Sequence, residues 1–204
     1  MKTLLCILIF AFNIYGQTSG TFTDVRDGQT YNWIKIGNQT WMAENLNYKP
    51  RSSGWAQYDK IYGLMYNWET ARNIAPPGWH LPSDEEWKEL ESYLGMSRSE
   101  LNNESSLERE SRNVGLKLKL KSGWRFYMQN GNGTDLVGFN ALPGGYRQFH
   151  SKRFMYYGSG ITFWTNTPYD RKNAYTRELG SHFNGIGRSP YYKVHGCYVR
   201  CIKD

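Results

Sequence analysis

Gly78-Trp79-His80-Leu81-Pro82-Ser83-Asp84-Glu85-Glu86-Trp87 is the most strongly patterned stretch of the chain. Pro82 disfavours helical backbone at the residue before it, so the segment that ends at Leu81 is expected to be extended. Ser83 is a good N-cap, and Glu86 three residues later completes a capping box. The stretch therefore predicts that a strand ends and a helix begins at Ser83.

The residues after the cap support a helix from about Ser83 to Leu94. Trp87, Leu90 and Leu94 recur at helical spacing, and Gly95 supplies a C-terminal stop. The acidic residues of the first turn complement the positive end of the helix dipole. We interpret the acidic face as a solvated surface that serves the dipole and solubility, and not as a site.

Length and composition indicate one domain with a real core. The chain has 204 residues, of which 16% are aromatic and 21 are Gly, a mixture that suits short strands joined by tight turns. The aromatic residues are either core side chains or exposed rings of the kind that stack on sugars. The composition leaves both interpretations open.

The net charge of +7 lies in the C-terminal part of the chain. From Leu142 onward there are ten basic and three acidic side chains, so the residues before Leu142 sum to zero. This half could face an acidic partner such as an anionic polysaccharide, or carry ordinary solvated Lys and Arg. Because the chain start indicates export, nucleic acid is not an expected partner.

Residues 1–16 have the pattern of a signal peptide. Lys2 forms a short basic region, residues 4–12 are apolar but too few to span a bilayer as a helix, and Gly16 precedes the expected cut. We expect an exported protein, secreted, periplasmic or on the cell surface, whose residues 17–204 form a single domain without a transmembrane segment.

The rest of the chain predicts strands, then helices, then strands. Residues 21–42 are expected to form a strand meander, residues 62–71 a short helix, and residues 116–120 either a strand or a helix edge. Beyond residue 138, turns at 143–145 and 158–160 separate expected hairpins, and residues 174–179 and 198–203 are expected strands. This order indicates an α+β domain.

Several stretches, in order, resemble the Fibrobacter succinogenes major paralogous domain family of exported bacterial domains. They are Asp27-Gly28-Gln29-Thr30-Tyr31, Ile36-Gly37-Asn38-Gln39-Thr40-Trp41-Met42-Ala43-Glu44-Asn45-Leu46, Tyr62-Gly63-Leu64-Met65-Tyr66-Asn67-Trp68, Pro77-Gly78-Trp79-His80-Leu81-Pro82, Gly138-Phe139-Asn140-Ala141-Leu142-Pro143-Gly144-Gly145, Phe163-Trp164 and Val199-Arg200-Cys201. The resemblance implies a C-type-lectin-like α+β fold with two helices, long loops and a twisted, mostly antiparallel sheet. It also implies a distant likeness to the formylglycine-generating enzyme fold, and it assigns no ligand or activity, because none is established for the family as a whole.

The residue pattern signals no metal or other cofactor. The four His residues lack metal-binding spacing, and the calcium tripeptides of sugar-binding C-type lectins do not occur. In one extended strand Cys197 and Cys201 would lie about 13 Å apart, whereas a disulfide needs Cα atoms about 4.4–6.8 Å apart. We therefore expect two free thiols there, and we expect His80 to be a packed, hydrogen-bonded structural residue.

No nucleophile–base–acid set can be assembled, so the preferred function is a non-catalytic binding or surface-interaction module, with glycans as candidate ligands. The alternatives are an enzyme on a formylglycine-generating-like scaffold and a structural cell-envelope subunit. The candidate ligand surface is the run of hairpin loops in the basic half, where rings and guanidinium groups alternate. Its candidate residues are Tyr169, Arg171, Tyr191, Tyr192 and Trp164.

Overall fold

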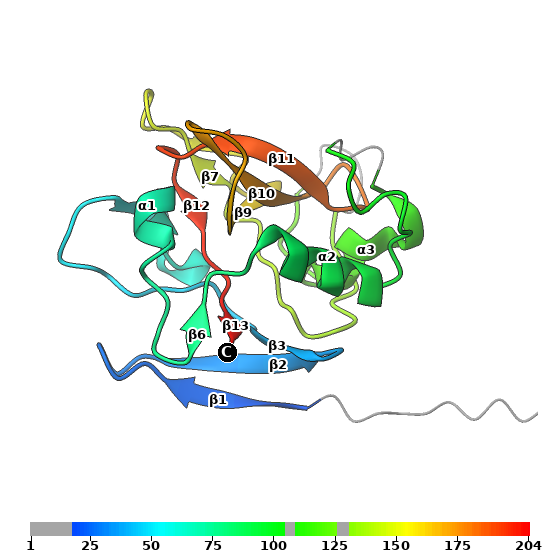
Figure 1. The fold of residues 1–204 in the computed structure, drawn as a ribbon, viewed down its shortest axis with the longest axis horizontal. Coiled ribbons are helices and arrows are strands. Elements are labelled where there is room, and N and C mark those ends of the chain that lie inside the picture. The colour runs from blue at the N-terminus through cyan, green and yellow to red at the C-terminus, as the bar shows by residue number, and fades with distance from the viewer. Residues whose placement is uncertain (1–17, 105–108, 126–130) are drawn as a thin grey trace, which may run out of the picture.

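The computed structural model describes residues 18–104, 109–125 and 131–204. In these ranges thirteen strands form three sheets, accompanied by three α-helices and two 3-10 helices. Figure 1 shows the N-terminal sheet along one side and strands β9–β11 along the other, with the red C-terminal segment running between them. The expected signal peptide at 1–16 lies outside the described residues.

The N-terminal sheet contains the expected meander. Strands β1, β2 and β3 pair antiparallel in sequence, and the Asp27-Gly28 turn joins the first two. Two short strands from distant parts of the chain then extend the sheet. Its spatial order is β1 (Ser19–Thr23), β2 (Thr30–Ile36), β3 (Gln39–Met42), β13 (Ile202–Lys203), β6 (Trp79–His80).

The second sheet has six strands and carries most of the basic half of the chain. Its long strands β9, β10 and β11 pair antiparallel, whereas β12 runs parallel to β9, with Tyr198 beside Phe163. Its spatial order is β11 (Gly187–Tyr192), β10 (Asn173–Gly180), β9 (Gly160–Pro168), β12 (Cys197–Tyr198), β5 (Met65–Tyr66), β4 (Trp55–Ala56).

The hairpins expected around residues 143–145 and 158–160 are wrong in their pairing. Strand β7 (Tyr146–Arg147), from the second arm of the first expected hairpin, pairs with β8 (Phe154–Met155), from the first arm of the second. The two strands form a separate two-stranded sheet. Gly144 is instead required by close packing, because a Cβ there would lie 2.4 Å from the Tyr198 hydroxyl oxygen. Gly144 therefore marks a close approach of the backbone to the buried ring of Tyr198.

The expected α+β class with two helices and a C-type-lectin-like sheet is wrong, because the described chain is mostly β with three α-helices. Only α2 is longer than five residues. The helix expected over 62–71 breaks at Gly63, whose φ of 77° ends a 3-10 turn, and the following residues pair as β5. The helical segments are η1 (Lys60–Tyr62), α1 (Trp68–Ala71), α2 (Asp84–Tyr93), η2 (Ser111–Asn113) and α3 (Val114–Leu118).

Helix α2 begins as the sequence predicts. The Ser83 hydroxyl accepts the Glu86 N–H at 3.2 Å, and the Glu86 carboxylate accepts the Ser83 N–H at 2.7 Å. Trp87 and Leu90 are fully buried, and the Trp87 ring lies 4.8 Å from that of Trp41. The capping box and the apolar stripe of this helix are both confirmed.

The acidic face of α2, in contrast, is only partly solvated. Asp84 and Glu91 are buried, and three buried Arg residues surround them. Arg177 bonds to Asp84 at 2.7 Å and to Glu91 at 2.5 Å, while Arg188 bonds to Asp84 and Arg109 bonds to Glu91. This buried ion cluster joins α2 to strands β10 and β11.

The C-terminal segment expected as one strand over 198–203 is split between the two large sheets. Strand β12 belongs to the six-stranded sheet and β13 to the five-stranded sheet. Cys197, Val199 and Cys201 are buried in one apolar cluster, and both thiols are free. Arg200 lies at the crossing, buried, and contributes to the cavity described next.

Candidate functional site

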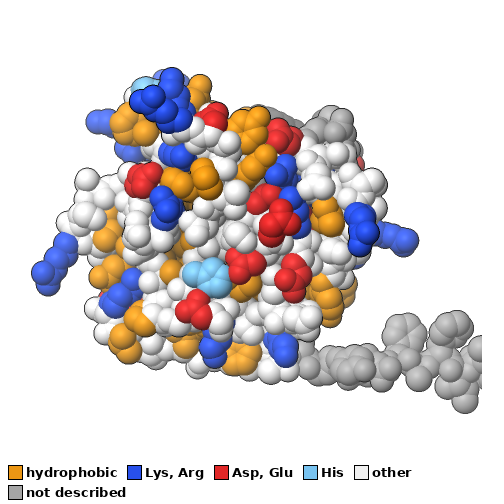
Figure 2. Space-filling model, viewed as in Figure 1, with side chains coloured by type: hydrophobic (Ala, Val, Ile, Leu, Met, Phe, Trp, Pro, Cys, Tyr) orange, Lys and Arg blue, Asp and Glu red, His pale blue; other side chains and the backbone are white. Residues whose placement is uncertain are grey.

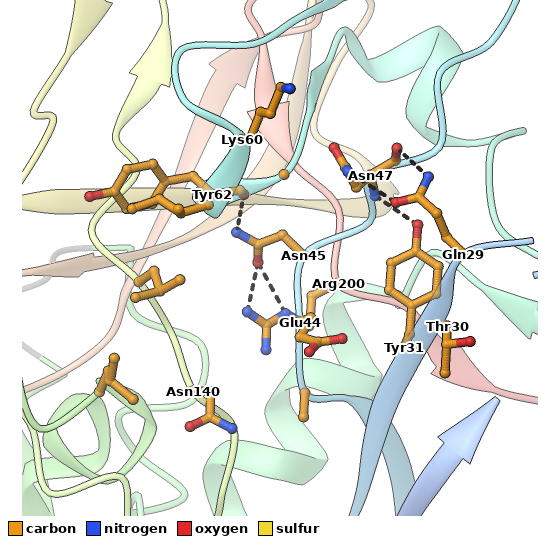
Figure 3. A pocket seen from close by; sticks show the side chains of 15 residues that line it. Gln29, Thr30, Tyr31, Glu44, Asn45, Asn47, Lys60, Tyr62, Asn140 and Arg200 are labelled. Atoms are coloured by element: carbon orange, nitrogen blue, oxygen red, sulfur yellow. Dashed lines mark hydrogen bonds between the residues drawn. The ribbon is translucent and has the colours of Figure 1, made fainter. Parts of the chain in front are cut away.

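A cavity of about 330 Å³ opens where the C-terminal segment passes from one sheet to the other. We call it the Arg200 pocket. It is enclosed by four segments, which are the start of β2, the segment after β3, the 3-10 turn η1 and the loop around Asn140 (Figure 3). Its lining residues are Gln29, Thr30, Tyr31, Ala43, Glu44, Asn45, Asn47, Lys60, Ile61, Tyr62, Gly63, Leu120, Asn140, Leu142 and Arg200.

The guanidinium of Arg200 is the dominant charge of this pocket. Its Nε and Nη2 donate to Oδ1 of Asn45 at 3.1 and 2.6 Å, and its Nη1 donates to the carbonyl oxygens of Phe139 and Met42. These acceptors are all neutral, and no carboxylate of the described residues forms an ion pair with Arg200. Burial lowers the pKa of Arg200 to about 9.

Asn45 orients that guanidinium. Its Nδ2 donates to the Tyr62 carbonyl oxygen at 2.9 Å, which fixes the amide so that its oxygen faces Arg200. Figure 3 shows this bond and the two bonds from Arg200 to the Asn45 amide oxygen as dashed lines. The neighbouring Glu44 forms no ion pair with this cation, and its carboxylate accepts from the Asn32 backbone and side chain at 3.0 and 2.7 Å. The charges of Glu44 and Asp135 act on Arg200 only at longer range and partly oppose the effect of burial on its pKa. With Lys60 and Arg200 against Glu44, the lining residues carry one net positive charge.

Amide and hydroxyl groups form the opposite side of the pocket. Asn47 donates to Gln29 at 3.0 Å, and the Gln29 amide donates back to the Asn47 carbonyl oxygen. The hydroxyl of Tyr31 accepts the Asn47 N–H at 3.1 Å, and burial raises the pKa of Tyr31. Amides both donate and accept, so this wall suits a ligand that carries several hydroxyl groups.

The same pocket offers little for covalent chemistry. Its described lining contains no His, Cys or Ser, and its one carboxylate, Glu44, is already hydrogen-bonded. Burial raises the pKa of Tyr62 to about 12, so this phenol stays protonated at neutral pH. Within the described ranges, moreover, no group of three or more His, Cys, Asp or Glu is placed to hold a metal ion.

Of the candidate ligand-binding residues expected from sequence, Trp164 does not reach the surface and Tyr191 is only partly exposed. Trp164 is fully buried, and its Nε1 donates to the Tyr66 carbonyl oxygen at 2.7 Å, so its assignment to a ligand site is wrong. Tyr191 is half-buried, with its ring 5.3 Å from that of Tyr146 and its hydroxyl 3.4 Å from Glu178. Their aromatic character was visible in the sequence, but the face they occupy was not.

The other three expected residues do lie at one end of the six-stranded sheet. Tyr169 is 46% exposed and Arg171 is also exposed, in the turn between β9 and β10. Tyr192, 55% exposed, pairs with Asn173 at the end of this turn. We call these three residues the hairpin surface.

His80 is hydrogen-bonded as expected, but it is only half-buried. Its Nδ1 lies 2.6 Å from a carboxylate oxygen of Asp204, and its Nε2 lies 2.7 Å from one of Glu86. Burial alone would lower the pKa of His80, but the bonds to Glu86 and Asp204 raise it. On the face seen in Figure 2, acidic side chains gather beside a histidine near the middle of the molecule. The three residues link the C-terminus to the start of α2.

The Arg200 pocket was missed from the sequence, although a signal for it was present. Most of its lining residues lie in the stretches that carry the family resemblance, among them Asn45, Tyr62, Asn140 and Arg200. These stretches were interpreted as fold determinants only. Nothing in their local pattern shows that they converge on one cavity.

Fold and cavity together define a mostly β domain with a polar, positively charged pocket between its two large sheets. The chain belongs to the Fibrobacter succinogenes major domain family, whose sequence profile matches residues 34–203. No curated protein and no solved structure matches the chain. In the described ranges, no helix has the length and apolar character needed to cross a bilayer.

Proposed function

We propose that this protein is an exported, non-catalytic binding module that holds an acidic glycan in the Arg200 pocket. The observation that carries the proposal is the buried guanidinium of Arg200, which lines the cavity and has only neutral acceptors. A buried charge without a counter-charge is costly, and a ligand carboxylate would supply that counter-charge. Export rests on the signal-peptide pattern of residues 1–16 and predicts a mature protein that begins at Gln17 when its N-terminus is sequenced.

The remaining lining of the pocket fits the rest of a sugar. The amides of Asn47 and Asn140 can exchange hydrogen bonds with ring hydroxyl groups in both directions, whereas Gln29, whose Nε2 already donates to Asp27 and Asn47, can only accept. Lys60 is exposed at the rim and adds a second positive charge. A volume of about 330 Å³ lies near the lower end of the roughly 300–1,000 Å³ typical of ligand pockets, which suits a ligand of one sugar ring.

The hairpin surface is a second candidate place for the same ligand class. It joins two exposed tyrosine rings to the Arg171 guanidinium at one sheet end. Its position on loops of a rigid sheet is typical of binding sites. In contrast to the pocket, its three side chains are all exposed.

A glycan array of the mature protein tests the function and separates the two places. We expect binding to uronic-acid-containing glycans over their neutral counterparts. Lys60→Glu should weaken this binding because it reverses a charge at the pocket rim, while the double variant Tyr169→Ala with Arg171→Ala should leave it unchanged. Loss of binding in the double variant alone would move the site to the hairpin surface. An array with no acidic glycan bound would contradict the proposed function.

A further inference from the structure

A second cavity, of about 170 Å³, lies on the face of the six-stranded sheet opposite the buried ion cluster. We call it the Glu178 cavity. Glu178 contributes its carboxyl group from β10, and Oε1 is buried with no hydrogen-bond partner among the described residues. Oε2 lies 3.4 Å from the Tyr191 hydroxyl, and the hydroxyl groups of Ser189, Tyr191 and Thr176 partly oppose the effect of burial on the pKa of this carboxyl. A buried carboxyl that is this poorly satisfied needs a physical explanation.

No cation of the described chain compensates this carboxyl. The neighbouring Arg177 points to the other face of the sheet, where it bonds to Asp84 and Glu91. His182 lines the cavity, but no described Lys, Arg or His forms an ion pair with Glu178. Burial accordingly raises the pKa of the Glu178 carboxyl. An isolated carboxyl is unexpected in a protein with a net charge of +7.

Aromatic rings surround the same carboxyl. Tyr156, Phe183 and Tyr191 line the cavity, and the ring of Tyr146 lies 5.3 Å from that of Tyr191 and 6.0 Å from that of Tyr156. Tyr156 is 60% exposed and has a φ of 57°, a left-handed conformation that is rare for a bulky residue. Aromatic faces attract cations through their quadrupoles. The cavity thus combines one carboxyl group that has no cationic partner among the described residues with ring faces.

We propose that the Glu178 cavity binds a small aliphatic ammonium group, with Glu178 as its counter-charge and the tyrosine rings as its walls. The inference does not depend on the glycan proposal, because the two sites share no lining residue. A cavity of about 170 Å³ is smaller than the roughly 300–1,000 Å³ of ordinary ligand pockets, so it fits a small amine or the tip of a lysine side chain.

The test is a titration of the ¹⁵N-labelled mature protein followed by NMR, with n-butylammonium chloride as the probe. n-Butanol has nearly the same shape without the charge, and sodium butyrate has the opposite charge. We expect n-butylammonium to shift the amide signals of Gly160 and Gly180, which line the cavity, at concentrations at which the other two compounds do not. Blocked lysine (N-acetyl-lysine methylamide) against blocked norleucine then separates a lysine side chain from a free amine as the source.

Glu178→Gln keeps the shape of the side chain and removes its charge. It should weaken n-butylammonium binding about tenfold or more, the loss expected for one charged hydrogen bond, while the protein stays folded. Glu85→Gln, which removes an exposed carboxylate of α2, is the matched control and should bind as the wild type does. Tyr156→Ala should weaken binding about two- to fivefold through the lost ring face.

Three results would overturn the proposal. One is equal shifts from n-butanol and n-butylammonium, which would show that charge plays no part. Another is unchanged n-butylammonium affinity in Glu178→Gln. The third is the absence of shifts at both glycines with every amine. The comparison of n-butylammonium with n-butanol needs only the wild-type protein, so it decides the matter even if a variant does not fold.

Discussion

Glu91→Gln should be among the most destabilising isosteric substitutions in this chain. Glu91 is fully buried and holds Arg177 and Arg109, each at 2.5 Å. Removing its charge leaves the buried guanidinium of Arg109 without its carboxylate partner, while Arg177 keeps only Asp84. Breaking a buried ion pair by removing one partner costs about 3–5 kcal/mol, because the remaining charge is left uncompensated.

Urea unfolding measures this loss directly. For a slope of about 2 kcal/mol per molar urea, a loss of about 3–5 kcal/mol moves the midpoint down by about 1.5–2.5 M. Glu85→Gln on the same helix is the control, since Glu85 is 80% exposed and pairs only with Lys88. Its effect should stay within about 0.5 kcal/mol.

If the free energy of unfolding of Glu91→Gln lies within about 1 kcal/mol of the wild-type value, the interpretation of the cluster is refuted. The triple variant Glu91→Leu, Arg177→Met and Arg109→Leu tests the same reasoning from the other side. Replacing buried ionic groups by apolar ones of similar volume is often neutral or stabilising, so the triple variant should unfold at a higher urea concentration than Glu91→Gln alone.

Three further predictions concern pH, the helix cap and the thiols. The pKa of His80 is raised in the folded state, so its contribution to stability is present below its unfolded pKa of about 6.5 and is lost as pH rises through the folded value. Melts measured at a series of pH values across this range should therefore show a fall in the stability of the wild type that the His80→Asn variant lacks. An identical dependence of stability on pH in both proteins would contradict this prediction. Ser83→Ala should cost about 0.5–2 kcal/mol in urea melts, and an unchanged midpoint would mean that the cap does not stabilise α2. Thiol titration of the unfolded, non-reduced mature protein should find both Cys197 and Cys201 free, whereas a monomer with no titratable thiol would contradict the structure.

The parts of the fold that the sequence predicts correctly are those encoded locally. The capping box joins Ser83 and Glu86 within one turn, and the first hairpin turns at Asp27-Gly28. Both signals depend on residues a few positions apart, so the chain pattern alone carries them. Of the helix expected over 62–71, only the last turn, α1 (Trp68–Ala71), is α-helical. Apolar residues three or four positions apart over so short a stretch do not distinguish a helix from a short strand followed by a turn of helix.

The parts that could not be predicted depend on distant residues. Glu91 and Arg177 are 86 positions apart, so Glu91 looked like a solvated residue on an acidic face. Arg200 and Asn45 are 155 positions apart, and only their convergence forms the pocket. Trp164 is of a residue type that often stacks on sugars, but its position on a central strand of the six-stranded sheet buries it. Local pattern gave the residue types of the sites without their positions in space.

The charge of Arg200 is the centre of the proposed function, and Asn45→Asp tests it most directly. The substitution changes one amide to a carboxylate that already lies 2.6 Å from the guanidinium, so it supplies internally the counter-charge that we assign to the ligand. The measurement is calorimetric titration of D-glucuronic acid and D-glucose into the wild type and this variant. The account predicts that the wild type binds D-glucuronic acid in preference to D-glucose and that the folded Asn45→Asp variant loses this preference. Equal affinity of both proteins for D-glucuronic acid would contradict it.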